Sequence, residues 1–326
     1  MGGLIAISVT LAGVITGVAQ AKELRLSHQW STQDLRHKVA EIVAEEVKSA
    51  NVGLEIKIFP SKSLFKPLEQ YRPLSRGQLD MTVFPLAYAS GQRPEYNLTL
   101  MPGLVKNHDH AARLSQSPFM AEIEQLMAED DVMVLVHGYL AGGFVGKEKC
   151  ISKPDDVKGI TIRAAGSAFD TMLAGAGASI TSMASSELYN AMQTGVLQGA
   201  NTSSSSFVSF RIYEQVKCYT PPADLALWFM YQPLLINKTT FEELNQEQQE
   251  ALLRGAKKAE DYYLSEAKLQ DSHSVEVFEE NGVEIYYMSD EDFDAWRELA
   301  KETSYKEFLR RVKNGQQLID MALSVE

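Results

Sequence analysis

The sequence predicts an α/β fold with two lobes, each built on a mainly parallel sheet, and a long helix that braces both lobes. Strand-like and helix-like segments alternate from Ala21 onward. A glycine pair, Gly142 and Gly143, is followed by charged residues 147–149, which indicates a segment that crosses from one half to the other. Residues 241–280 are charged and helix-favouring and contain no proline, so this stretch is long enough to contact both halves.

The first half begins with a strand and a helix. Leu24 and Leu26 alternate with charged residues, which predicts a strand that leads into residues 27–30. Residues 31–34 have the S-x-x-D form of a helix start. Apolar residues at helical spacing follow this start: Leu35, Val39, Ile42, Val43 and Val47.

Four further strands are predicted from short apolar segments. Residues 54–58 alternate and end before Pro60, and residues 81–84 end before Pro85. Residues 132–136 are a continuous apolar run, which is typical of a buried parallel strand. Residues 160–162 alternate and lead into Arg163.

The N-terminal segment has the features of an export signal. Residues 1–20 carry no charged side chain, and the segment ends in an A-x-A-like pattern at Ala21, directly before a charged pair. We therefore expect residues 1–21 to be a signal peptide that is cleaved after Ala21. An uncleaved anchor is the alternative. The lack of a basic start also leaves open an upstream beginning of the signal.

Composition restricts the possible partners. The 326 residues are 45% apolar and 23% charged, as in ordinary globular proteins, and the net charge is −12. Nucleic acids and anionic membrane surfaces require clustered basic residues, so neither is an expected partner. An acidic protein can still bind an anion through a few local cations.

Cysteines and histidines give no metal or catalytic motif. Cys150 and Cys218 predict one disulfide in an exported chain, with two buried free thiols as the alternative. His108 and His110 could ligate a metal, but a loop or helix start after Asn107 is the preferred interpretation. No nucleophile elbow, P-loop or zinc-protease motif occurs. We therefore expect no catalytic activity, no metal and no cofactor.

Arg163 is the main candidate for chemistry. It stands at the C-terminal end of its predicted strand, and ligands of open α/β sheets bind outside such ends. A guanidinium there can hold a carboxylate by two parallel hydrogen bonds. A surface arginine paired with a nearby acidic residue is the alternative.

The residues around Arg163 resemble a known family. Residues 158–163 read K-G-I-T-I-R, Gly177-Ala178 follows, and residues 186–199 read S-E-L-Y-N-A-M-Q-T-G-V-L-Q-G. Together with residues 77–81, this pattern closely resembles the solute-binding proteins of TRAP transporters, the DctP family, over essentially the whole chain after residue 21.

The resemblance implies a two-lobed periplasmic binding protein that closes like a Venus flytrap around a small organic acid. It implies residues 22–139 with 230–270 as lobe I and residues 140–229 with 271–326 as lobe II. The protein would be periplasmic, non-enzymatic and monomeric, and it would deliver its ligand to the small and large permease subunits. Arg163 would bind the ligand carboxylate.

The sequence also departs from the family pattern. Residues 140–144 lack the second arginine that many members carry, and the family's D-G-Q-E-N motif reads Q-G-A-N-T at residues 198–202. We therefore expect a monocarboxylate with an apolar or aromatic body, with Gly142 and Gly143 leaving room for it. A sugar acid or a short hydroxy acid is the alternative ligand. Other possible functions are a receptor for an ABC importer, an exported enzyme and a chemosensory module.

Ten residues are predicted to contact the ligand, because they lie near strand ends or match the family motif. They are Arg163, Asn201, Thr202, His28, Trp30, Phe84, Tyr88, Phe144, Ser185 and Trp228.

Overall fold

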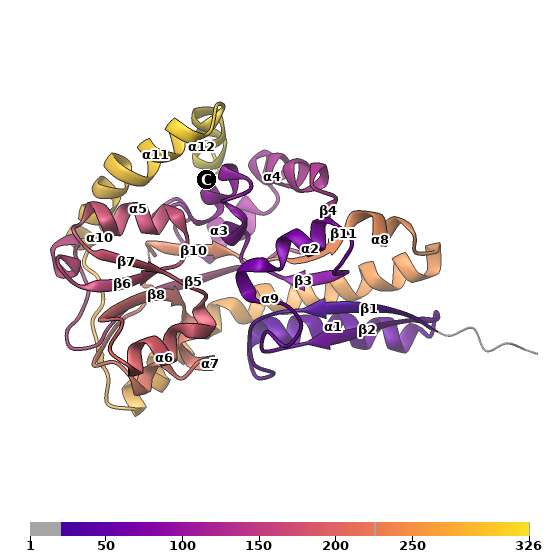
Figure 1. Cartoon of the computed structure of the whole chain (residues 1–326), viewed down its shortest axis with the longest axis horizontal. Coiled ribbons are helices and arrows are strands. Elements are labelled where there is room, and N and C mark those ends of the chain that lie inside the picture. The colour runs from indigo at the N-terminus through magenta and orange to yellow at the C-terminus, as the bar shows by residue number, and fades with distance from the viewer. Residues whose placement is uncertain (1–20, 225, 326) are drawn as a thin grey trace, which may run out of the picture.

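The computed structural model describes residues 21–224 and 226–325 and consists of two sheets surrounded by helices (Figure 1). The predicted signal peptide therefore lies outside the described residues, apart from Ala21. The first sheet has the strand order β2-β1-β3-β11-β4. Its strands are β1 (Lys22–Ser27), β2 (Leu54–Phe59), β3 (Met81–Val83), β4 (Val132–Val136) and β11 (Leu234–Asn237). We call this sheet and the helices on it lobe I.

The second sheet has the order β12-β9-β5-β8-β6-β7, with β10 paired to β5. Its strands are β5 (Tyr139–Gly146), β6 (Thr161–Ala164), β7 (Ser179–Ser182), β8 (Gly199–Ser203), β9 (Cys218–Thr220), β10 (Trp228–Tyr231) and β12 (Glu284–Ile285). This sheet and its helices form lobe II. The predicted two-lobed α/β fold is confirmed, but the expectation of mainly parallel sheets was wrong. Each sheet is mixed, with parallel pairs such as β1–β2 and β6–β7 beside antiparallel pairs such as β4–β11 and β5–β8.

Helices cover both sheets, as expected for an α/β fold. They are α1 (Leu35–Ala50), α2 (Tyr71–Ser75), α3 (His108–Leu114), α4 (Pro118–Glu129), α5 (Ser167–Gly175), α6 (Leu188–Gln193), α7 (Ser204–Ser209), α8 (Lys238–Glu242), α9 (Gln246–Glu280), α10 (Asp290–Ala300), α11 (Lys306–Arg311) and α12 (Gly315–Leu323). None of the described helices is long and apolar enough to cross a lipid bilayer.

Two local predictions were wrong. The helix predicted to start with the S-x-x-D segment begins later, because Asp34 itself caps α1 by accepting a hydrogen bond from the Arg36 backbone N–H. The apolar run of β4 forms a strand at the end of its sheet, and this strand pairs antiparallel with β11 rather than with parallel neighbours. Side chains of α4 and α9 pack on β4, and this packing explains why an end strand is apolar.

Two short connections join the sheets. The chain passes from β4 to β5 through His137 and Gly138, and from β10 back to β11 through Gln232 and Pro233. The Gln232 backbone N–H donates to the Gly138 carbonyl over 2.7 Å, so the two connections are bonded side by side. The limits between the lobes that were predicted from the family resemblance stay a prediction. The change of sheet itself falls at these two connections.

Helix α9 is the third link between the lobes and confirms the predicted long helix. It has 35 residues and starts after Asn245, which forms a capping box with Gln248. It runs from α8 beside lobe I to the region of α7 in lobe II (Figure 1). Its first half packs closely on α1, where Gly255 allows the two backbones to approach.

Candidate functional site

Arg163 lies in the interior of the molecule, and its side chain is 0% exposed. It belongs to β6, between the parallel strands β7 and β8, in register with Thr181 and Ala200. Its Nε donates to the Met183 carbonyl at 3.0 Å, and its Nη1 donates to the Asn201 carbonyl at 2.6 Å. Both acceptors are backbone carbonyls, one within β8 and one directly after β7, so the strand arrangement itself holds the guanidinium.

Among the described residues, the charge of Arg163 has no ion-pair partner. Within the described chain, no carboxylate oxygen lies within 4.0 Å of its guanidinium nitrogens. Burial raises the pKa of the Asp170 carboxyl, while Arg163 acts in the opposite direction without forming an ion pair. A buried cation without a counterion is costly, and proteins normally pair such groups. The arrangement can therefore accept an anion.

Tyr88 completes the surroundings of Arg163 from the other lobe. It lies on a 3-10 turn after β3 (Leu86–Ala89), and its hydroxyl oxygen accepts from Arg163 Nη2 at 2.8 Å and from the Ser185 backbone N–H at 3.3 Å. Phe84 packs edge-on against the Tyr88 ring, with 6.1 Å between centroids. The structure thus brings four of the predicted residues together: Arg163, Tyr88, Ser185 and Phe84.

A second group of predicted residues lies on adjacent strands of lobe II. Asn201 on β8 and Phe144 on β5 are cross-strand partners, and Phe144 also pairs with Thr220 on β9. Both amide atoms of Asn201 are buried without a hydrogen-bond partner, and so are Thr220 Oγ1 and Trp228 Nε1. Buried polar groups are normally paired, so these atoms are candidates for contacts with a polar ligand.

The aromatic residues are more deeply packed than expected. Phe144 stacks on Trp296 at a centroid distance of 5.3 Å, within the core cluster that also contains Trp228. The expectation that Gly142 and Gly143 leave room for a ligand was wrong. A Cβ atom at Gly142 would lie 1.9 Å from the Thr202 carbonyl oxygen, so this glycine is needed for the close approach of β8.

His28 and Trp30 form a third group after β1. The Trp30 backbone N–H donates to His28 Nδ1 at 3.3 Å, so the neutral ring carries its proton on Nε2 and donates to His37 Nδ1 at 3.0 Å. Burial, and then the neighbouring His37, lower the pKa of His28 to about 3. His28 is therefore an uncharged hydrogen-bonding residue at neutral pH, and it supplies no cation for a ligand.

Sequence reasoning missed Arg36, a second buried arginine. Its side chain is 1% exposed, forms a two-point ion pair with Asp34 and lies over the Trp30 ring at 4.0 Å. Asp34 neutralises its charge, in contrast to Arg163. A charged residue next to the apolar positions of a helix start was the available signal. Gln29 was also missed, and both of its amide atoms are buried without a partner.

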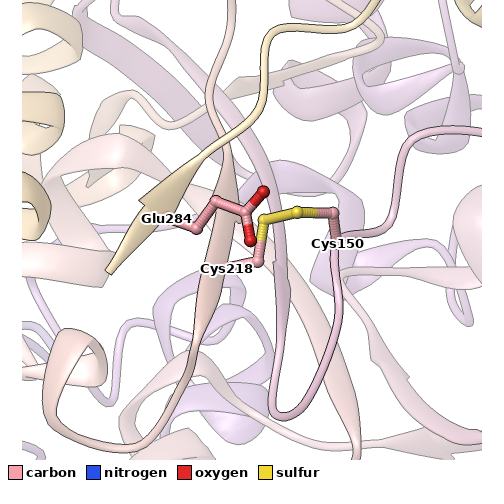
Figure 2. Close-up of side chains that lie close together, drawn as sticks. All are labelled: Cys150, Cys218 and Glu284. Atoms are coloured by element: carbon pink, nitrogen blue, oxygen red, sulfur yellow. A yellow bond between two sulfur atoms is a disulfide. The ribbon is translucent and has the colours of Figure 1, made fainter. Parts of the chain in front are cut away.

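The alternative metal sites are engaged in other interactions. His108 starts α3 after the cap Asn107, as expected, and its Nε2 lies 2.7 Å from Asp271. Cys150 and Cys218 are joined in a disulfide (Figure 2). Glu284 lies beside the sulfur atoms, but a disulfide offers no thiolate to a metal ion.

Comparison with known proteins identifies a family and several similar chains. Residues 26–311 match the family described as bacterial extracellular solute-binding protein, family 7. A solute-binding protein from Albidiferax ferrireducens is 33% identical over 99% of this chain and 96% of its own length.

Solved structures are similar along almost the whole chain. A TRAP periplasmic solute-binding protein from Rhodoferax ferrireducens with bound malonate is 32% identical, with a TM-score of 0.89 over 93% of this chain and 98% of that one. A TRAP solute-binding protein from Sulfitobacter with bound β-D-galacturonate is 24% identical, with a TM-score of 0.86 over 93% and 99%. The second likeness shows the fold alone.

Proposed function

Because the chain belongs to family 7 of the bacterial extracellular solute-binding proteins, the periplasmic binding subunits of TRAP transporters, we propose that it holds one ligand carboxylate on Arg163. As a binding subunit it is not an enzyme. Its ligand is a small organic acid, and its membrane partners are TRAP transporter components. We further propose that it acts as a monomer, that it is cleaved after Ala21, and that it delivers the acid to a small and a large permease subunit.

The observation that carries the proposal is the unpaired charge of Arg163. Three of its five N–H groups donate to Met183, Asn201 and Tyr88, which leaves one N–H on each terminal nitrogen. Two such groups match the two oxygens of a carboxylate. The Tyr88 hydroxyl accepts two hydrogen bonds and donates none within the described chain, so it can also donate to the anion.

The number of free cations favours a ligand with a single carboxylate. Arg36 is the other buried arginine near the contact between the lobes, and Asp34 already forms an ion pair with it. A second carboxylate would therefore meet no other unpaired buried arginine in the part of the chain that the structure describes. For the rest of the ligand, we propose an apolar or aromatic body beside Trp228.

A sugar acid is the second candidate. The unpaired amide of Asn201 and the unpaired hydroxyl of Thr220 favour a ligand that carries hydroxyl groups, because each would otherwise remain buried without a partner. The Sulfitobacter protein that binds β-D-galacturonate has the same fold. Both candidates share the single carboxylate on Arg163.

A ligand panel tests the proposal. The protein is unfolded, dialysed and refolded to remove bound ligand, and it is then titrated in a calorimeter with benzoate, β-D-galacturonate and malonate. We expect one-to-one binding of at least one of the two monocarboxylates and weaker binding of malonate. Strong preference for malonate would contradict the single-carboxylate proposal. Preference for galacturonate over benzoate would select the second candidate.

A further inference from the structure

Arg36 links parts of the molecule that are distant in the sequence. Its Nε and Nη2 bind Asp34 in lobe I, each at 2.7 Å. Its Nη1 donates to the Gln232 side chain, in the β10–β11 connection, at 2.8 Å. Its Nη2 also donates to Ser205 Oγ at 3.2 Å and Ser206 Oγ at 2.9 Å, both on α7 of lobe II. One guanidinium therefore joins lobe I, lobe II and the connection between them.

The lobe II end of this network begins next to the candidate ligand site. Arg163 holds the Asn201 carbonyl on β8, and Arg36 Nη1 lies 3.3 Å from the hydroxyl of Ser203 at the end of the same strand. The unpaired side-chain amide belongs to Asn201 itself, two residues before Ser203. Strand β8 is thus held at Asn201 by an arginine of lobe II and at Ser203 by an arginine of lobe I.

The network is buried and its donors are satisfied. Asp34, Ser205 and Ser206 are all buried, and the five N–H groups of Arg36 find acceptors, one of them shared between the two serines. Hydrogen bonds to a charged group are stronger than neutral ones, and shielding from water makes their loss costly. The serine contacts require the two lobes to be close together, so a separation of the lobes breaks them.

We propose that Arg36 is a positioning residue for ligand binding: its bonds to Ser205 and Ser206 stabilise the arrangement in which the lobes meet around the ligand. The inference rests on the proposed role of Arg163. Interactions that exist only when the lobes are together favour that state and slow the separation of the lobes. Arg36 therefore acts on the dissociation of the ligand more than on its association.

The sharpest test removes the lobe II acceptors and keeps the ion pair. In a Ser205→Ala/Ser206→Ala variant, Arg36 remains paired with Asp34, so no buried charge is left alone. Ser209→Ala is the matched control, because Ser209 lies on the same helix and its hydroxyl has no hydrogen-bond partner in the described chain. Benzoate and β-D-galacturonate serve as probes in stopped-flow measurements, and thermal unfolding verifies that each variant is folded.

We expect the double variant to release the tighter-binding probe about 10-fold faster, with an association rate within about twofold of the parent. The Ser209→Ala control should match the parent in both rates. Leu68 in lobe I and Val196 in lobe II are exposed and can be replaced by cysteine for labelling with fluorophores. The labels should report a larger fraction of molecules with separated lobes in the double variant. An unchanged dissociation rate, or an equal change in the control, would overturn the inference.

A failure of the inference about Arg36 can be distinguished from a failure of the proposed role of Arg163. If Arg163→Met abolishes binding of the probes while the double serine variant keeps the parent dissociation rate, the inference about Arg36 fails alone. If Arg163→Met binds them like the parent, the role of Arg163 fails, and the inference that rests on it fails as well.

Discussion

Replacement of Arg163 by methionine separates binding from folding. Methionine fills a similar volume but carries no charge and no N–H group. If the ligand carboxylate accepts the two free N–H groups, the variant loses two charge-assisted hydrogen bonds of about 1.5–3 kcal/mol each. The sum of about 3–6 kcal/mol corresponds to a loss of affinity of about 10²- to 10⁴-fold.

The same substitution should change the stability of the ligand-free protein little. The Met183 and Asn201 carbonyls lose a donor, which costs about 1–3 kcal/mol for each buried group left unpaired. At the same time a buried cation without a counterion is removed, which is favourable. Because the two effects oppose each other, we expect a net change in the free energy of unfolding of no more than about 2 kcal/mol.

The assay compares unfolding with and without ligand. A ligand at 100 times its Kd stabilises the parent by about 2.7 kcal/mol, and this gain should vanish in Arg163→Met at the same concentration. Arg163→Lys should also bind poorly, since an ammonium group cannot form the two parallel hydrogen bonds that a guanidinium makes to a carboxylate. Arg310→Ala, which removes an exposed ion pair with Glu307, is the control and should bind normally. A folded Arg163→Met variant with affinity within threefold of the parent would refute the reasoning.

Two further predictions concern stability. Opening the Cys150–Cys218 disulfide, which closes a loop with a sequence separation of 68, by Cys150→Ser should lower the free energy of unfolding by about 4 kcal/mol in urea titrations. An unchanged urea midpoint would contradict this effect. The pKa of His28 is about 3 in the folded protein against 6.5 in the unfolded chain, so protons favour the unfolded chain and stability falls as the pH drops below 6.5. Between pH 7 and 5 the free energy of unfolding should fall by about 2 kcal/mol through this effect, and His28→Gln should remove that fall. An equal loss of stability in the parent and the variant would argue against the role of His28.

The position of Arg163 could be predicted because its information is local. An alternating strand ends at this residue, a turn and a helix follow, and the family pattern extends on both sides of it. The structure adds what no local pattern contains, namely that its acceptors are carbonyls of β8 and of residue 183 rather than a carboxylate.

Arg36 could not be found in this way, because its lobe II partners follow it by about 170 residues in the sequence. The wrong interpretation of β4 has a different cause. A continuous apolar run reports burial on both faces, and helices packed on an end strand produce the same pattern as neighbours in a parallel sheet. The number of strands on either side of a run is a property of the whole sheet.

The long helix α9 is anchored in both lobes. Near its start, a Cβ atom at Gly255 would lie 3.1 Å from the Cα of Val43 in α1 of lobe I. Near its other end, Asp271 accepts from Ser204 at 2.6 Å, and Ser274 bonds Tyr219 at 2.9 Å, both in lobe II. At 1.5 Å per residue the helix is about 50 Å long. It is therefore an elastic rod that is fixed to a different lobe near each of its ends. Any rotation of the lobes relative to each other must bend α9 or break its contacts with one lobe. The bending stiffness of the helix therefore limits the amplitude of the motion.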